Sequence, residues 1–380
     1  MRLFKLQRKS VCTAIVLVAI SATLIAIPGF DSGRYAPSGS VKAKVLSVDD
    51  SSIYQTGIIL QGDQYCELLI QDGAHSGQTV RGANKLIGKL ELDKRFVPGD
   101  SALIALDFQN GQIIEPVTII DHYRLTAELW LFGGFVLLLV AFAGLTGFNA
   151  LLSFVVTVLC VWKLLLPAIL AGFDPISISM AITIGLTCVI IFAIGGFTRK
   201  GVSAALGSLL GTLLTGTLAV AFGDLFKVHG AVMPFAENLL YSGYSHLDLT
   251  KIFISCIFLA SSGALMDLAM DIASAIEEVS IKRPDLSKKE AIFSGLSVGR
   301  SVIGTMTTTL LLAYSGGYMS LLLVFMAQGT PVMNILNLKY VAAEIMHTLI
   351  GSIGLVTVAP FTALVAGLLL GRRDQRASET

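Results

Sequence analysis

Residues 127–146, AELWLFGGFVLLLVAFAGLT, and residues 148–170, FNALLSFVVTVLCVWKLLLPAIL, follow one another with a single glycine between them. Each run has about the 20 apolar residues that a helix needs to cross a bilayer. Between them the two runs contain only two charged residues, Glu128 and Lys163. The stretch therefore predicts a pair of membrane-spanning helices.

Apolar runs of similar length recur along the rest of the chain. Of its 380 residues, 54% are hydrophobic and only 14% are charged, whereas an ordinary soluble domain has about a quarter charged residues. With one run at the N-terminus, we expect a polytopic α-helical membrane protein with about eight transmembrane helices. The other runs cover residues 176–196, 202–222, 252–273, 301–326 and 341–370, and the last is expected to tilt or break at Pro360.

The N-terminal apolar run, residues 11–27, follows four basic residues and resembles both a signal peptide and a membrane anchor. A cleaved signal usually ends in small residues of the A-x-A type, and Ile25-Ala26-Ile27-Pro28 fits that pattern poorly. We therefore expect residues 1–28 to form a cytoplasmic basic tail and a retained first anchor.

Residues 29–125 have the composition of a water-soluble segment. From Val41 to Arg124, short alternating apolar runs are separated by turn residues, a pattern typical of strands. About five or six short strands in such a segment predict an OB-like or similar small β barrel that folds on its own. The predicted turns are Gln61-Gly62-Asp63, Gln71-Asp72-Gly73, Pro98-Gly99-Asp100 and Gln109-Asn110-Gly111.

Basic residues predict the orientation of the chain, because short cytoplasmic loops retain Lys and Arg. With the N-terminus inside, Arg199-Lys200, the loop from Lys282 to Arg300 and the basic tail of residues 372–380 all become cytoplasmic. Both termini are then cytoplasmic, the β domain of residues 29–125 is extracytoplasmic, and residues 126–371 form a seven-helix membrane domain.

Small residues are spaced by four in the run of residues 202–222. Such ridges mark close helix–helix contacts in lipid, and lining of a transport path is the alternative. One ridge is Ser203, Gly207, Gly211 and Thr215, and the other is Ala204, Ser208, Thr212 and Gly216.

Acidic residues form a stripe at the end of the run of residues 252–273. Asp267 and Asp271 share one helix face, and carboxylates inside a membrane usually bind cations or relay protons. Arg300 enters at a similar depth, and Thr305 follows it, so these four residues are one candidate polar site. The alternative is that Asp271 lies at the interface and that Arg300 extends to the cytoplasmic surface.

Glu344 and His347 form a second candidate pair, one turn apart on one face of the last predicted helix. This spacing can bind a metal in helical bundles, and a structural polar contact is the alternative. Because Glu344 lies toward the outer end of its helix and Asp267 toward the inner end of its own, we expect two separate sites.

The sequence offers no support for enzymatic, cofactor or nucleic-acid chemistry. It lacks a GxxxxGK[ST] phosphate loop, a G-x-S-x-G elbow and a nucleic-acid motif. Only Cys66 lies in the soluble segment, so a disulfide within that domain is excluded, and the other cysteines fall in apolar runs. We expect no enzyme, no cofactor and no nucleic-acid partner.

The chain resembles the YibE/YibF-like family of bacterial multi-pass membrane proteins. The resemblance covers most of residues 125–371, and its β domain is similar to that of the longer, YibE-like members. It implies a location in the bacterial inner or cytoplasmic membrane. This chain has Ser301 and Thr308 where relatives often have an acid and an amide. The stretches that carry the resemblance are Ser261–Glu278, Arg283-Pro284-Asp285-Leu286, Gly299–Tyr314 and Ala342–Pro360.

Two functions fit these observations. The first is a transporter or permease, coupled to protons or cations through acids within the membrane. The second is a non-catalytic membrane component whose β domain binds a partner protein or an envelope ligand. Beyond the lipid bilayer, the expected partners are another membrane protein or further copies of the chain. Metal-dependent hydrolysis at Glu344 and His347 is a distant third, because no nucleophile accompanies them.

Overall fold

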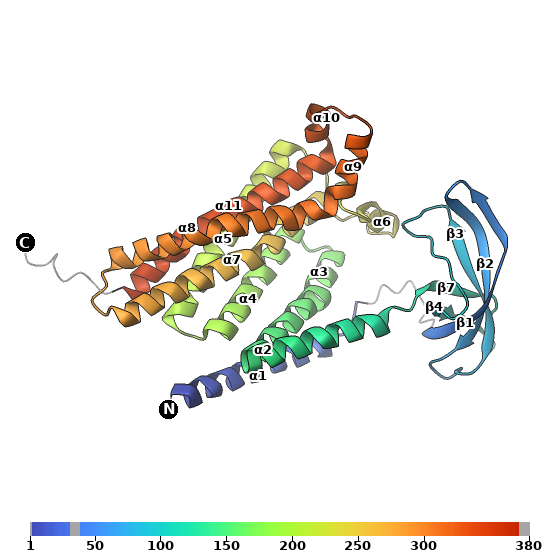
Figure 1. The fold of residues 1–380 in the computed structure, drawn as a ribbon, viewed down its shortest axis with the longest axis horizontal. Coiled ribbons are helices and arrows are strands. Elements are labelled where there is room, and N and C mark those ends of the chain that lie inside the picture. The colour runs from blue at the N-terminus through green and yellow to red at the C-terminus, as the bar shows by residue number, and fades with distance from the viewer. Residues whose placement is uncertain (1, 31–38, 372–380) are drawn as a thin grey trace, which may run out of the picture. The chain divides into compact units, whose positions relative to one another are not determined.

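The computed structural model describes residues 2–30 and 39–371, with side chains described from Val11 onward (Figure 1). The predicted basic tail of residues 372–380 lies outside the described residues. The chain forms two compact units, one of residues 1–30 and 139–380 and the other of residues 31–138. The first is a bundle of helices, and the second contains a small β barrel.

The barrel confirms the prediction of a small β fold after the first helix. Five strands close in the order β1-β2-β3-β7-β4. The β3–β7 pairing is parallel, and the other pairings are antiparallel. The strands are β1 (Gly39–Thr56), β2 (Ile59–Ile70), β3 (Thr79–Ile87), β4 (Ser101–Leu106) and β7 (Val117–His122), and a separate hairpin joins β5 (Phe108–Gln109) to β6 (Gln112–Ile113).

Two buried amides link the barrel strands to the segment that follows β3. Gln64 donates to the Phe96 carbonyl at 3.0 Å and accepts from the Phe96 N–H at 3.0 Å. Asn84 donates to Gln64 Oε1 at 3.2 Å and to the Lys94 carbonyl at 2.6 Å. These bonds fix the segment around Phe96 in the barrel, because a buried polar group is stable only when it is paired.

One of the predicted turns was wrong. Gln61-Gly62-Asp63 is not a turn but part of β2, where Gly62 has a φ of 116° and pairs with Ile53. The turn is instead made at Gly57, whose φ is 62°. In strand β3, Gly82 and Asn84 occupy two of the inward positions, which interrupts the apolar alternation.

The helical unit contains most of the long apolar helices. Of the described residues, six stretches are long and apolar enough to cross a membrane, and Val11–Ala26 is a shorter apolar helix. The helices are α1 (Arg2–Ala26), α2 (Leu125–Cys160, which begins in the other unit), α3 (Leu166–Leu170), α4 (Pro175–Gly195), α5 (Arg199–Phe226), α6 (Ala236–Tyr241), α7 (Leu249–Lys282), α8 (Lys288–Ser315), α9 (Met319–Ala327), α10 (Val332–Asn337) and α11 (Lys339–Leu370).

Helix α2 is broken at Gly144, close to the predicted boundary between its two apolar runs. Gly144 has φ 56° and ψ −131°, which no α-helical residue adopts. A Cβ at Gly147 would lie only 3.1 Å from the carbonyl carbon of Leu139, although eight residues of straight helix span about 12 Å. The chain therefore turns sharply at Gly144. By contrast, α11 continues through Pro360 without a break.

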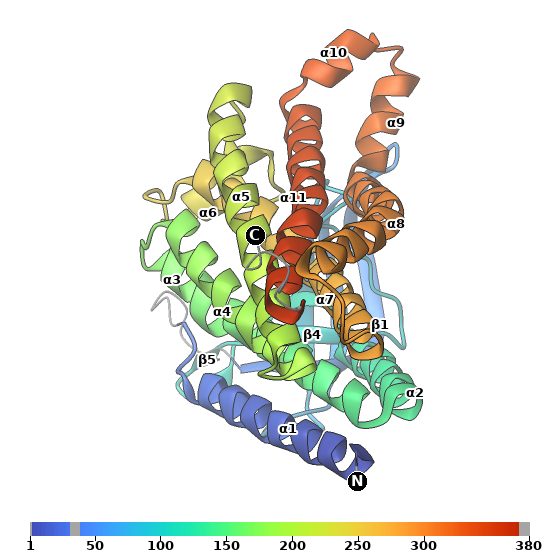
Figure 2. The same ribbon diagram turned by 90° about the vertical axis from the view of Figure 1, so that its left-hand side faces the viewer.

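Helix α5 packs closely against its neighbours through both predicted ridges of small residues. All eight ridge residues are buried. A Cβ at Gly211 would lie 3.1 Å from Val358 of α11 and 3.1 Å from Leu265 of α7, and one at Gly216 would lie 2.5 Å from Met180 of α4. Figure 2 shows α11 between α5 and α8. The packing role predicted for the ridges is confirmed.

This packing predicts a strong effect of a single methyl group. A Cβ at Gly207 would overlap Thr362 Oγ1 and lie 2.7 Å from the Thr362 Cα, so Gly207→Ala must displace α11 backbone. We expect a loss of about 1–3 kcal/mol of stability, the usual cost of overpacking. The matched control is Gly263→Ala on α7, where a Cβ meets open space. Thermal unfolding of the detergent-purified chain measures the stability of both variants. If Gly207→Ala and Gly263→Ala melted at the same temperature, the packing argument would be contradicted.

The basic loops of the bundle gather at one of its ends. Lys200 pairs with Glu277 at 3.2 Å, and Arg199 donates to the Leu369 carbonyl at 3.4 Å. A Cβ at Gly371 would lie 2.7 Å from the Lys288 Cα. The start of α5, the end of α7, the start of α8 and the end of α11 are therefore neighbours.

Asp174 and Lys251 join α4 and α7 where these helices begin. Asp174 caps α4 by accepting from the Ser177 N–H at 3.0 Å, and its carboxylate pairs with Lys251 at 2.9 Å. The hydrogen bond from Lys251 and those from Ser177 lower the pKa of Asp174 to about 2. Both helices therefore start at the end of the bundle opposite Lys200 and Glu277.

Candidate functional site

The four residues of the first predicted site lie on exposed helix faces. Asp267 and Asp271 are exposed on α7, whose buried face carries Leu268 and Ile272 instead. At 1.5 Å per residue, Asp267 lies about 27 Å along α7 from Leu249 and Asp271 about 33 Å. Asp271 thus lies beyond the roughly 30 Å thickness of a hydrocarbon core measured from the start of α7.

Arg300 and Thr305 do not join these acids. Arg300 was expected at the start of its helix, but α8 begins at Lys288, where Ser287 and Glu290 form a capping box. Hydropathy detected only the apolar part of α8, so this boundary was wrong by more than three turns. Thr305 donates to the Val302 carbonyl at 2.9 Å. Among the described residues, no ion pair links Arg300 to Asp267 or Asp271.

Glu344 and His347, in contrast, lie half-buried on α11 and meet an aromatic side chain from α8. The His347 ring stacks on the Tyr314 ring, with 4.2 Å between centroids and 24° between planes. Glu344 lies one turn before His347 on the same face of α11. The predicted i, i+3 pair is therefore one half of a cluster between α11 and α8, and we call Glu344, His347 and Tyr314 the α8–α11 cluster.

Each member of the α8–α11 cluster has a buried polar atom without a hydrogen-bond partner among the described residues. These atoms are Glu344 Oε1, His347 Nε2 and the Tyr314 hydroxyl. A buried polar atom without a partner costs free energy, so most proteins pair such atoms. Three such atoms in one place make the α8–α11 cluster the candidate site for a proton, an ion or a polar ligand.

Helix α7 lies beside this cluster. A Cβ at Gly351, one turn beyond His347, would lie 3.4 Å from Ser261 Cβ and 3.7 Å from Tyr314 Cε2. The absence of a side chain at Gly351 thus lets α7, α8 and α11 approach one another. The Ser261 hydroxyl donates to the Ile257 carbonyl at 2.9 Å. Ser261 therefore adds no unpaired polar atom to the α8–α11 cluster.

The two candidate sites lie at different depths. Ser261 and Gly351 are level with each other, Asp267 lies six residues beyond Ser261, and His347 lies four residues before Gly351. Because α7 and α11 run in the same direction, these offsets separate Asp267 from His347 by on the order of 15 Å along the bundle.

The α8–α11 cluster contains two possible metal ligands, Glu344 and His347. No group of three or more His, Cys, Asp or Glu side chains suited to a metal occurs among the residues that the structure describes. The aromatic member, Tyr314, was missed as a site residue. Its only signal in the sequence is a hydroxyl group within an apolar run, which also occurs at membrane interfaces.

The fold and the site define a class of protein: a bundle of long apolar helices with a cluster of ionisable side chains between two of them, and a separate small barrel in the same chain. A family model described as "YibE/F-like protein" matches residues 131–372, more than half of the sequence. The chain therefore belongs to the YibE/F-like family, as its sequence predicted. No curated protein and no solved structure matches it.

Proposed function

We propose that this chain is a multi-pass membrane transporter driven by a proton or a cation, with the α8–α11 cluster as the coupling site. The observation that carries the proposal is the set of unpaired buried atoms on Glu344, His347 and Tyr314. A carboxyl and an imidazole inside a membrane typically mark ion pathways and proton relays.

The six long apolar stretches and the family support the membrane assignment. We propose eight spans. The stretch Leu125–Leu170 has 46 residues, more than twice the length of one span, and it turns at Gly144, so it supplies two. Helix α1 supplies the eighth. The proposed location is the bacterial inner or cytoplasmic membrane.

The direct test is flux through the purified chain in proteoliposomes that carry an imposed pH gradient and an internal pH-sensitive dye. We expect the gradient to collapse faster than in protein-free liposomes when Na⁺, K⁺ or Mg²⁺ is supplied on one side. Equal rates with and without protein, for every cation, would contradict coupling to these ions.

The basic end of the bundle predicts the topology. Arg199, Lys200 and Lys288 lie at that end, and the positive-inside rule makes it cytoplasmic. A single cysteine placed at Gln109 of the barrel should react with a membrane-impermeant maleimide in intact cells. A cysteine at Lys288 is the matched control and should react only after permeabilisation. If the cysteine at Lys288 reacted in intact cells and the one at Gln109 did not, the topology would be the opposite of the one proposed.

A second function, a non-catalytic component that assembles with a partner, is favoured by one observation. Asp267 is exposed on α7 at a depth within the roughly 30 Å hydrocarbon core, and a carboxylate is costly against lipid. A partner membrane protein or a further copy of the chain would cover it. Copurification of another chain in a fixed ratio, together with the absence of flux, would favour this function over transport.

A further inference from the structure

The second half of helix α1 packs against the bundle. Leu17 and Leu24 are buried and pack in one cluster with Val156 of α2 and Leu186 of α4. Just past the end of α1, Lys163 donates to the Ile27 carbonyl at 2.9 Å.

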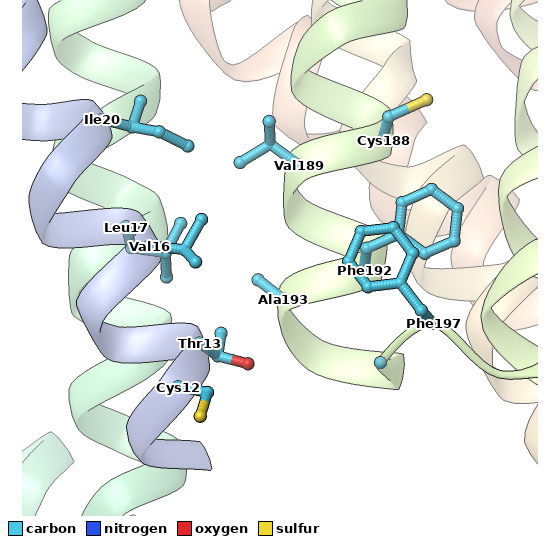
Figure 3. Close-up of a pocket in the computed structure, with 11 residues that line it drawn as sticks. Cys12, Thr13, Val16, Leu17, Ile20, Cys188, Val189, Phe192, Ala193 and Phe197 are labelled. Atoms are coloured by element: carbon cyan, nitrogen blue, oxygen red, sulfur yellow. The ribbon is translucent and has the colours of Figure 1, made fainter. Parts of the chain in front are cut away.

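Toward the start of α1, an open groove of about 1010 Å³ separates it from the end of α4. Val16 and Ile20 line one wall, and Val189 and Ala193 line the other (Figure 3). Cys12 and Thr13 lie at the same end of the groove as Ala193 and Phe197, whereas Ile20 lies nearer Val189 (Figure 3). The two helices are therefore antiparallel here, and the groove volume is at the upper end of the about 300–1,000 Å³ typical of ligand sites.

The groove is lined by apolar side chains, two thiols and the Thr13 hydroxyl, and by no charged group. Phe192 and Phe197 stack against each other at its α4 wall, with 4.6 Å between ring centroids. Such a lining suits hydrocarbon, because it offers dispersion contacts and almost no hydrogen bonds.

The sequence that leads into the Cys12 end of this groove is basic. Helix α1 extends from Arg2, so the turns that precede Cys12 contain Arg2, Lys5, Arg8 and Lys9. Residues 1–30 contain no acidic residue to neutralise them. The nearby basic pair on α5 is already engaged, because Lys200 pairs with Glu277 and Arg199 donates to the Leu369 carbonyl.

We propose that the groove between α1 and α4 binds an anionic glycerophospholipid, with its acyl chains against α4 and its phosphate toward the start of α1, where the sequence is basic. The proposal rests on the membrane assignment made above. The two parts of such a lipid match the two parts of the site. The acyl chains match the apolar walls of the groove, and the anionic head group matches the basic sequence at the start of α1. Basic segments beside a membrane helix attract anionic lipids in this way. A bound lipid here would fill the space between α1 and the bundle.

The test is native mass spectrometry of the full chain purified in detergent, with added dioleoylphosphatidylglycerol or dioleoylphosphatidylcholine. These probes have the same acyl chains and differ in head-group charge. We expect the anionic lipid to be retained about tenfold more than the zwitterionic one. Equal retention of both lipids, or retention of neither, would overturn the proposal.

Two kinds of variant locate the bound lipid. Ala193→Trp fills the groove, and the double change Arg8→Gln with Lys9→Gln removes charge without altering its walls. Each should reduce retention of the anionic lipid about tenfold. The matched control is Leu213→Trp, on an exposed face of α5, which should retain it. If only the control lost retention of the anionic lipid, or if both groove variants kept it, the lipid would bind elsewhere.

Two further measurements separate this proposal from its alternatives. Efficient oxidative crosslinking of Cys12 to Cys12 of another copy would show that a second chain occupies the groove, which would overturn lipid binding there. Carbonate extraction of membranes tests the membrane assignment on its own. Release of the chain by carbonate would overturn that assignment, whereas retention with no bound lipid would overturn the groove proposal alone.

Discussion

Replacing Glu344 with glutamine is expected to reduce coupled flux in proteoliposomes to the protein-free rate, a loss on the order of 100-fold, as for other positioned acid–base groups. Glutamine keeps the shape of the side chain but has no proton to exchange. Because Glu344 Oε1 has no hydrogen-bond partner among the described residues, the substitution breaks no hydrogen bond at that atom. Expression and membrane insertion should therefore be unchanged.

The control for Glu344→Gln is Glu237→Gln on the short helix α6, where the carboxylate is exposed. This variant should transport normally. Tyr314→Phe is a graded companion, since it keeps the ring that stacks on His347 at 4.2 Å and removes only the hydroxyl. Normal flux in Glu344→Gln would show that the α8–α11 cluster is a structural contact and not the coupling site.

The predictable parts of this fold are those encoded by nearby residues. Apolar runs predicted the long helices, and the spacing of Glu344 and His347 predicted that they share a face of α11, because helical periodicity is a local property. The break at Gly144 also lies within three residues of Gly147, where the apolar runs were divided. Spacing by four in α5 predicted close packing for the same reason.

The parts that were missed depend on contacts between distant residues or on polar signals. Helix α8 begins at the capping box of Ser287 and Glu290, twelve residues before Arg300, and hydropathy does not detect such a cap. Tyr314 meets His347 only because α8 packs against α11. No local pattern contains the positions of both residues, so the sequence predicted the pair on α11 and not its partner on α8.

Replacing Asp267 with asparagine is expected to abolish flux while expression and insertion remain intact. Asp267 is exposed on α7 and pairs with no basic side chain among the described residues. The change therefore removes charge without breaking an ion pair within the chain. An acid at this depth is either neutralised or covered by a partner, and a group that can change between those states suits proton or cation coupling.

The comparison of Asp267→Asn with Glu344→Gln identifies how the two depths are used. The sites lie on the order of 15 Å apart along the bundle, so a path that crosses the membrane needs groups at both levels. Loss of flux in both variants would indicate that Asp267 and the α8–α11 cluster are two sites on one ion path. If Asp267→Asn transports normally while Glu344→Gln does not, Asp267 is a polar residue of the α7 surface, and the coupling site is the α8–α11 cluster alone.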